Sequence, residues 1–277
     1  MYLRPKTLDE AVVQLKTPGI KILSGGTDFY PALADHVAPE RVMDISGLRE
    51  LRGISTEANY FRIGGLTTWT DVIRAPLPRC FDALKSAARE VGSVQIQNRG
   101  TVAGNLCNAS PAADGVPPLL ALDAEIELAS SSGSRRLPLA EFLVGNRKTN
   151  RRPDELLTAV WVPRGLEDAN SVFLKLGARR YLVISISMVA VVIDVEGGQI
   201  AAARVAVGSC SAVARRLPML EKDLIGATIE GELSRRVTAA HLEPLAPIDD
   251  VRATAGYRRE ASSILIRRAL DACMEAA

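Results

Sequence analysis

Histidine and the common catalytic and nucleotide-binding signatures are scarce or missing in this chain. The 2 histidines, His36 and His241, lie far apart, and there is no HExxH or GxSxG pattern. Zinc hydrolysis and Ser-His-Asp catalysis therefore have almost no support. GxGxxG and Walker patterns are also absent, which argues against an NAD-binding Rossmann domain and a P-loop NTPase. A chain so poor in proton-transfer residues suits the holding of a redox cofactor better than acid–base work.

Paired cysteines are missing as well. The 4 cysteines, Cys80, Cys107, Cys210 and Cys273, are far apart and none forms a CxxC pair. This spacing predicts reduced, buried thiols rather than disulfides, a zinc site or an iron–sulfur cluster. For Cys107, which lies in a polar stretch, we expect a buried packing role, with approach to a cofactor as the alternative.

Neither an excess of one charge nor a long apolar run is present. The net charge is +2, from 34 basic and 32 acidic residues, which argues against a dedicated nucleic-acid surface. Isolated basic pairs such as Arg151-Arg152 are predicted to lie on solvated faces. No uncharged apolar run approaches the 18 or more residues of a membrane span, and the start of the chain, MYLRPKTLDEAV, resembles no secretory signal. We therefore expect a soluble, cytoplasmic protein without a membrane span.

Two stretches rich in small and polar residues stand out against this background. The longer, Thr101 to Asp114, reads TVAGNLCNASPAAD. In it Gly104 allows close approach of the main chain, asparagine and serine side chains offer donors and acceptors, and Asp114 can accept from a sugar hydroxyl. The shorter, Ser24 to Asp28, follows an apolar run and should form a turn rich in free backbone N–H groups. Two such loops suggest one dinucleotide.

Patterning divides the chain into three blocks, 1–55, 56–165 and 166–277, and indicates a mixed α+β fold. The first two blocks should be small α/β units. Their expected strands are 21–23, 41–44, 60–63, 125–129 and 158–162, and their expected helices are 7–15, 29–35, one capped by Thr70, 81–91 and 116–120, with the glycine-rich stretch as a loop. The third block should hold a meander, 172–178, 183–195 and 200–208, followed by helices 218–224, 233–239 and 257–276.

The two polar stretches also carry a family resemblance. The run Gln97 to Asn105, its continuation Asn108 to Asp114, and Ser24 to Asp28 together resemble the FAD-binding medium subunit of the molybdenum hydroxylases. That family includes the flavoprotein subunit of carbon monoxide dehydrogenase and the flavin domain of xanthine dehydrogenase. The resemblance covers the whole chain. It implies a two-subdomain flavin fold of the vanillyl-alcohol-oxidase (PCMH-like, FAD-binding type 2) kind, followed by the family's C-terminal domain, a three-stranded antiparallel sheet with helices.

The resemblance also implies which residues bind the cofactor. Ser24 to Asp28 would wrap the pyrophosphate with main-chain N–H groups, and Asp114 would bind a ribose or ribityl hydroxyl. Lys175 matches a lysine near the flavin ring, where a cation would stabilise reduced, anionic flavin; an exposed strand lysine is the alternative. The full set of expected binding residues is Leu23, Ser24, Gly25, Gly26, Thr27, Asp28, Thr68, Thr101, Gly104, Asn105, Asn108, Ser110, Asp114 and Lys175.

Two aromatic residues and one departure from the family pattern complete this comparison. We expect Trp69 to pack in the core rather than to stack on the flavin, and Tyr181 either to shield the ring or to pack. After Arg179-Arg180 the family usually shows an acid, but this chain continues Tyr181 to Ser185 without one.

The resemblance finally implies an oxidoreductase subunit with noncovalent FAD, because the pyrophosphate loop contains no histidine. Molybdopterin would lie on a large partner subunit and [2Fe-2S] clusters on a small one, and FAD would pass electrons to NAD+, O2 or another acceptor. A self-standing FAD-dependent reductase or oxidase, and a scaffold that has lost FAD, are the alternatives. The substrate stays open, because the molybdenum site lies on another chain.

Overall fold

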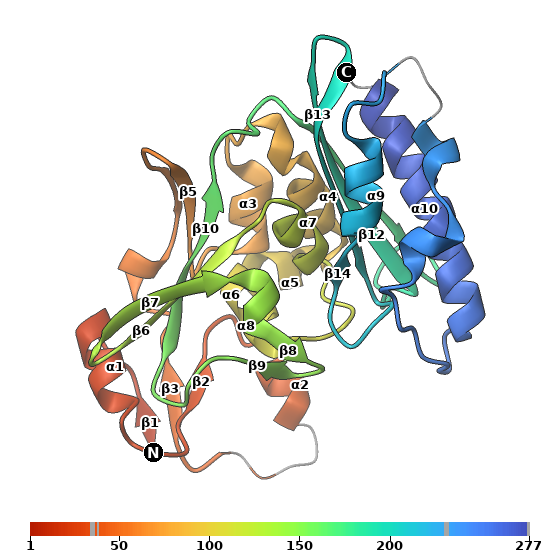
Figure 1. Cartoon of the computed structure of the whole chain (residues 1–277). Coiled ribbons are helices and arrows are strands. Elements are labelled where there is room, and N and C mark those ends of the chain that lie inside the picture. The colour runs from red at the N-terminus through yellow and green to blue at the C-terminus, as the bar shows by residue number, and fades with distance from the viewer. Residues whose placement is uncertain (34–36, 38, 230–232, 276–277) are drawn as a thin grey trace.

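The computed structural model describes residues 1–33, 37, 39–229 and 233–275, and this part of the chain forms three main sheets with helices around and between them (Figure 1). These sheets have 3, 5 and 4 strands. A separate 2-stranded hairpin is also present. His36 and the last residues of the helices expected at 29–35 and 257–276 lie outside the described residues.

The first sheet contains the N-terminal strands in the order β1 (Tyr2–Leu3), β3 (Val42–Asp44) and β2 (Lys21–Leu23), paired in parallel. Helix α1 (Leu8–Gln14) begins after Thr7, whose hydroxyl accepts from the Glu10 N–H at 3.2 Å, and α2 spans Phe29–Leu33. Buried apolar side chains, Met43 and Leu48 among them, hold this unit together. The expected helix at 7–15 and strands at 21–23 and 41–44 are confirmed.

The second sheet is antiparallel and has the order β4-β5-β10-β6-β7. Its strands are Ile54–Thr56, Tyr60–Gly64, Leu156–Pro163, Glu125–Ser130 and Gly133–Pro138. Patterning missed the two edge strands, β4 and β7, because pairing with a neighbouring strand rather than their own mostly polar residues makes them strands. The hairpin β8 (Leu143–Gly145) and β9 (Lys148–Thr149) and the short helix α8 (Leu139–Phe142) follow β7 and were also missed.

A group of short helices packs beside this sheet (Figure 1). They are α3 (Trp69–Arg74), η2 (Arg79–Phe81), α4 (Asp82–Glu90), α5 (Val94–Arg99), α6 (Val102–Asn108) and α7 (Val116–Ala121). The 3-10 turn η1 (Arg49–Leu51) instead packs its Leu51 in the core of the first unit. Two expectations were wrong here. The cap of α3 is Thr68 rather than Thr70, since Thr68 and Asp71 form a reciprocal capping box. The stretch from Thr101 is not all loop, because its first half forms α6 with Thr101 as the cap.

The third sheet lies between two layers of helices (Figure 1). Its strands are β11 (Asn170–Leu176), β12 (Ser187–Glu196), β13 (Gln199–Gly208) and β14 (Arg215–Arg216), so a fourth short strand joins the expected three. Helices α4 and α7 contact one side, while α9 (Pro218–Leu224) and α10 (Ala255–Glu275) contact the other. The 3-10 turns η3 (Leu233–Arg236) and η4 (Ala239–Leu242) replace the helix expected at 233–239. Strand β12 begins at Ser187 rather than at residue 183, and the segment before it turns at Leu182, which has a φ of 52°.

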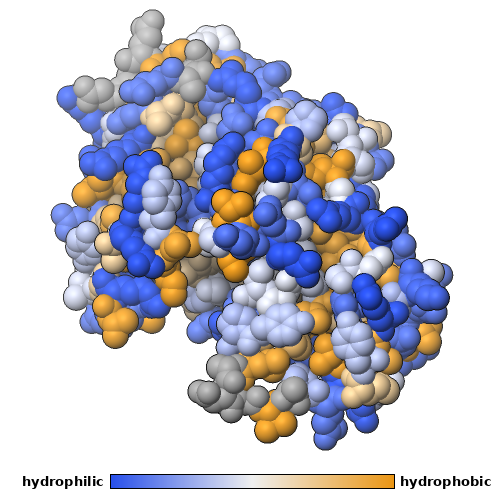
Figure 2. Space-filling model, turned by 180° about the vertical axis from the view of Figure 1, so that it is seen from behind, coloured by the Kyte–Doolittle hydropathy of each residue, from blue (hydrophilic) through white to orange (hydrophobic). Residues whose placement is uncertain are grey.

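On the face seen in Figure 2, apolar side chains are scattered among hydrophilic ones rather than gathered in one large patch. None of the described helices is both long and apolar enough to cross a membrane.

Candidate functional site

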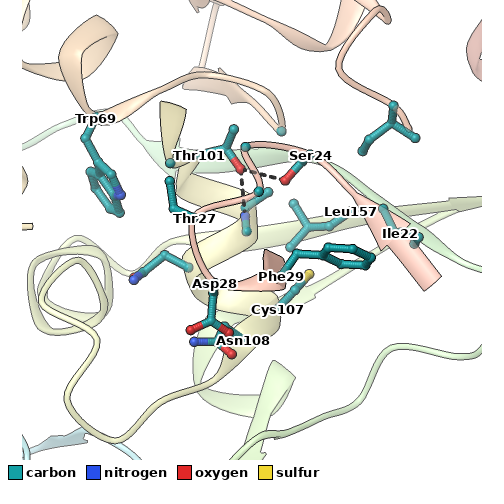
Figure 3. A pocket seen from close by; sticks show the side chains of 18 of the residues that line it. Ile22, Ser24, Thr27, Asp28, Phe29, Trp69, Thr101, Cys107, Asn108 and Leu157 are labelled. Carbon is teal, nitrogen blue, oxygen red and sulfur yellow. Dashed lines mark hydrogen bonds between the residues drawn. The ribbon is translucent and has the colours of Figure 1, made fainter. Parts of the chain in front are cut away.

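The two polar stretches of the sequence meet directly in the structure. A β-carbon added at Gly25 would lie 2.0 Å from the carbonyl oxygen of Arg99, so no other residue could stand at position 25 without moving one backbone. Ser24 Oγ and Thr101 Oγ1 lie 3.4 Å apart across the same junction (Figure 3). The turn after β2 is therefore packed against the start of α6.

Thr101 organises the second stretch. Its hydroxyl accepts from the Gly104 N–H at 3.0 Å, which caps α6 (Figure 3). Two backbone bonds fix the segment in place: Val102 N–H to Thr67 O at 2.9 Å and Trp69 N–H to Gly100 O at 3.2 Å. The position of the start of α6 thus depends on the Thr67–Trp69 segment. Within this segment, Thr68 is buried and caps α3.

A cavity of about 560 Å³ opens between the two stretches. Its size is within the usual range for small-molecule and cofactor sites. The expected binding residues that line it are Ser24, Gly25, Gly26, Thr27, Asp28, Thr101, Gly104, Asn105 and Asn108. Leu23 is buried behind the turn, and neither Leu23, Thr68, Ser110, Asp114 nor Lys175 belongs to the lining. The two stretches are thus brought together, while the last part of the longer one lies elsewhere.

Asp114 and Lys175 instead form a buried ion pair. Lys175 Nζ donates to Asp114 Oδ2 at 2.6 Å, and Ser185 Oγ donates to Asp114 Oδ1 at 2.7 Å. Burial raises the pKa of Asp114, and the ammonium of Lys175 opposes that rise. Lys175 is therefore not the exposed strand lysine of the alternative interpretation. It also lines a second cavity of about 480 Å³, together with Glu90, Arg179 and Arg180.

The structure adds cavity residues that sequence patterns did not indicate. The charged ones are Arg147 and Arg151, which come from the β8–β9 hairpin and the loop after it. Of the pair expected on a solvated face, Arg152 is exposed, whereas Arg151 is partly exposed and its guanidinium donates to the Glu155 carbonyl at 2.7 Å. A short basic run before a proline is typical of an exposed loop, so nothing in the local sequence indicated that Arg151 lines a cavity. The remaining lining residues, which were not in the expected binding set, are Ile22, Phe29, Ile45, Gly65, Trp69, Val91, Ile96, Gly100, Ala103, Cys107, Thr149, Leu156 and Leu157.

The four cysteines differ in their exposure. All four thiols are free, and three are buried as expected, but Cys107 is exposed and lines the cavity, so its expected packing role was wrong. It faces outward because α6 turns its Leu106 side into the core.

Trp69 is 1% exposed, which confirms core packing, and it also forms part of the cavity wall. Tyr181 is 62% exposed, with the Arg180 guanidinium 5.3 Å from its ring centre.

One buried atom tests what the cavity could hold. Asn105 Oδ1 is buried without any hydrogen-bond partner, so a ligand that donates a hydroxyl or amine hydrogen would satisfy it. Among the described residues no group of His, Cys, Asp and Glu could hold a metal ion. Close backbone approach, polar side chains and an unpaired acceptor fit a polar cofactor such as a dinucleotide. The fold and site thus define a cofactor-binding protein of the α+β class.

The comparisons with known proteins specify the cofactor. Residues 1–165 match the family described as the FAD binding domain in molybdopterin dehydrogenase, and residues 173–273 match the CO dehydrogenase flavoprotein C-terminal domain. The chain therefore belongs to the FAD-binding subunits of the molybdenum hydroxylases, which are oxidoreductase subunits.

Individual relatives are similar over nearly their whole length. The glyceraldehyde dehydrogenase medium chain of Sulfolobus acidocaldarius is 31% identical, over 97% of this chain and 96% of that one. The xanthine dehydrogenase FAD-binding subunit of Escherichia coli is 31% identical, over 100% of this chain and 96% of that one. Among solved structures, reconstituted CO dehydrogenase from Oligotropha carboxidovorans contains a chain with a TM-score of 0.93 and 26% identity, covering 100% of this chain and 98% of that one. The expected family and fold class are confirmed.

Proposed function

We propose that this subunit binds FAD noncovalently and relays electrons within a three-part complex. A partner with [2Fe-2S] clusters would supply the electrons, a large molybdopterin subunit would oxidise the substrate, and NAD+, O2 or another acceptor would receive the electrons. Similarity to subunits named for glyceraldehyde, xanthine and carbon monoxide dehydrogenases supports this arrangement and leaves the substrate open. Bound FAD would supply the redox chemistry of this subunit, because flavins handle both one- and two-electron steps.

The observation that carries the proposal is the close approach of Gly25 to the backbone just before Thr101, in a cavity that the unpaired Asn105 also lines. The turn from Ser24 to Asp28 would offer its main-chain N–H groups to the pyrophosphate, which has two negative charges and needs several donors. Asn105 Oδ1 would accept from a hydroxyl or amine of the cofactor. The division into units at residues 55 and 165 and the roles of Leu23, Thr68 and Ser110 remain part of this proposal.

Asp114 and Lys175 would act on the flavin side of the site. Both carboxylate oxygens of Asp114 are already bonded within the chain, so a cofactor hydroxyl would have to share Oδ1 with Ser185 or Oδ2 with Lys175. The positive charge of Lys175 is balanced by Asp114, and this pairing limits the field that it could apply to a reduced flavin. We propose that the pair keeps Lys175 oriented toward the second cavity.

Replacement of Asn105 tests the binding site. Asn105→Ala removes an unpaired buried acceptor from the free protein, so its stability should be unchanged or higher, whereas the dissociation constant for FAD should rise about tenfold. Asn59→Ala is the matched control, because Asn59 is exposed and outside the cavity. Titration of the full chain with FAD, followed by flavin fluorescence, measures both variants. Equal FAD affinity of Asn105→Ala and the wild type would remove this cavity from the proposal.

Purification from the native source tests the relay. We expect the chain to copurify with a molybdopterin subunit and an iron–sulfur subunit, and reduction of the clusters should be followed by bleaching of the flavin absorbance. Turnover of an organic substrate by the isolated chain would instead support the self-standing reductase or oxidase. A chain that cannot be reconstituted with FAD would support the scaffold.

A further inference from the structure

The β8–β9 hairpin reaches across the mouth of the cavity through Arg147. The Arg147 Nη1 donates to Asn108 Oδ1 at the end of α6 and lies 3.3 Å from Asp28 Oδ2 in the turn after β2. One guanidinium therefore contacts both polar stretches that form the cavity, although it comes from a third segment of the chain. Asp28 and Asn108 lie next to each other in Figure 3.

The backbone supports this placement. Arg147 has a φ of 52° and Ala109, which ends α6, has a φ of 47°, a left-handed conformation that residues other than glycine seldom adopt. The two residues are joined, because Arg147 N–H donates to Ala109 O at 2.9 Å. The hairpin tip is thus docked on the end of α6 in a conformation that local preference disfavours, which points to a role for the side chain that it positions.

The charges of the cavity wall point to an anionic ligand. Its charged residues are Asp28, Arg147 and Arg151, so the wall has one more positive than negative charge. Arg151 is held by backbone carbonyl groups, whereas Arg147 is 60% exposed and its carboxylate partner Asp28 is 53% exposed. An ion pair that open to solvent is weak, so Arg147 is free to exchange Asp28 for a stronger anion. A diphosphate offers such an anion to a guanidinium in fork geometry.

We propose that Arg147 is a binding residue for the diphosphate of the cofactor, and that Asp28 holds its guanidinium at the cavity mouth until the diphosphate takes it. This inference rests on the proposed FAD site. It adds a cation from outside the two polar stretches, and it gives the Asp28 side chain the role of a competitor for Arg147. The main-chain N–H groups around Asp28 keep their own role.

Arg147→Gln tests the proposal, with Lys148→Gln as the matched control. Lys148 is the adjacent residue of the hairpin, is exposed, and does not line the cavity. In the full chain, Arg147→Gln should raise the dissociation constant for FAD about tenfold or more, mainly through faster dissociation, while Lys148→Gln should stay within about twofold of the wild type. The affinity for FAD should also depend less steeply on salt in Arg147→Gln, because a screened charge pair has been removed.

ADP identifies the part of the cofactor that Arg147 contacts. ADP carries the diphosphate without the flavin, so its inhibition constant against FAD should rise by the same factor in Arg147→Gln. Unchanged ADP binding would overturn the proposal. Loss of affinity through a loosened hairpin would instead lower the melting temperature of the free protein by more than about 3 °C, and that result would also overturn it.

Asp28→Asn provides a test in the opposite direction. The substitution keeps the main-chain N–H groups and frees Arg147, so FAD affinity should rise; a fall would overturn the competitor role of Asp28. The wild type separates this inference from the proposed function. Wild-type protein that binds no FAD would contradict the proposed function, whereas wild-type binding with equal affinity in Arg147→Gln would contradict only the role of Arg147.

Discussion

Lys175 and Asp114 form an ion pair with a nitrogen–oxygen distance of 2.6 Å, and their side chains are only 7% and 9% exposed. The pair joins β11 of the third sheet to the segment just before α7. Ion pairs at such depth depend strongly on both partners, because either charge left alone in the interior is costly. The pair therefore ties the C-terminal sheet to the region that carries the cavity.

Removal of one partner should be far more harmful than removal of both. Lys175→Met leaves the Asp114 carboxylate buried with only Ser185 as a side-chain donor, so the free energy of unfolding should fall by about 3 kcal/mol. The double variant Asp114→Asn/Lys175→Met should recover much of that loss. Urea denaturation of the single and double variants gives the coupling energy, and strictly additive effects would contradict a buried pair.

The loss in Lys175→Met should also depend on pH. Burial raises the pKa of Asp114 above its ordinary value of 3.8, and without Lys175 the hydrogen bond from Ser185 is what still opposes this rise. A carboxyl whose pKa is raised in the folded state favours folding at low pH and loses that contribution as pH rises through the folded pKa. The variant should therefore be closest to wild type in acid and furthest from it at neutral pH. Denaturation series at several pH values measure this trend.

Gly25→Ala should abolish cofactor retention. Its β-carbon would lie 2.0 Å from Arg99 O, so the turn and the end of α5 must separate, and FAD affinity should fall more than about tenfold. Gly256→Ala is the control, because a β-carbon there meets no atom within 4 Å. The ratio of flavin to protein absorbance after gel filtration measures retention. Full FAD occupancy in Gly25→Ala would show that the cofactor site tolerates the separation of these two segments.

Thiol labelling should distinguish Cys107 from the other cysteines. Cys107 is exposed on the cavity wall, whereas Cys80, Cys210 and Cys273 are buried. Burial of its sulfur raises the pKa of the Cys107 thiol to about 11, so labelling should be slow at neutral pH and faster at alkaline pH. Under alkaline conditions a small alkylating reagent should modify one thiol in the folded chain and all 4 after denaturation. Bound FAD should slow the first reaction, because it covers the cavity wall. Mass spectrometry of the labelled peptides checks the site, and equal rates with and without FAD would place the cofactor away from α6.

Asp250 should contribute to stability only above acid pH. Hydrogen bonds from the Arg252 N–H and from the buried Arg258 lower its pKa from 3.8 to about 2. A lowered pKa favours folding above the ordinary value, and the contribution is lost as pH falls through the folded pKa, here between about 4 and 2. Asp250→Asn should flatten the acid limb of the stability profile. Asp271→Asn, an exposed change in α10, should leave that limb as in the wild type.

The sequence-based expectations were accurate where local interactions form an element and failed where contacts between distant segments form it. Strand β2 and helix α9 were predicted to the residue, since a short apolar run before a glycine turn and a proline at a helix start are local signals. The edge strand β7 was missed, because its partner β6 rather than its own composition makes it a strand. The cap of α3 was placed two residues late, because Asp71 pairs with Thr68 and not with Thr70.

By itself the sequence determined the family and the two polar stretches. Gly25, Gly104 and the small residues around them are local signals of a backbone that lies very close to its neighbours. Only the tertiary structure decided which distant residues complete the site. It turned Cys107 outward, carried Arg147 across the cavity mouth and joined Lys175 to Asp114. Each of these contacts depends on how separate elements pack, and residues so far apart along the chain leave no local pattern that records it.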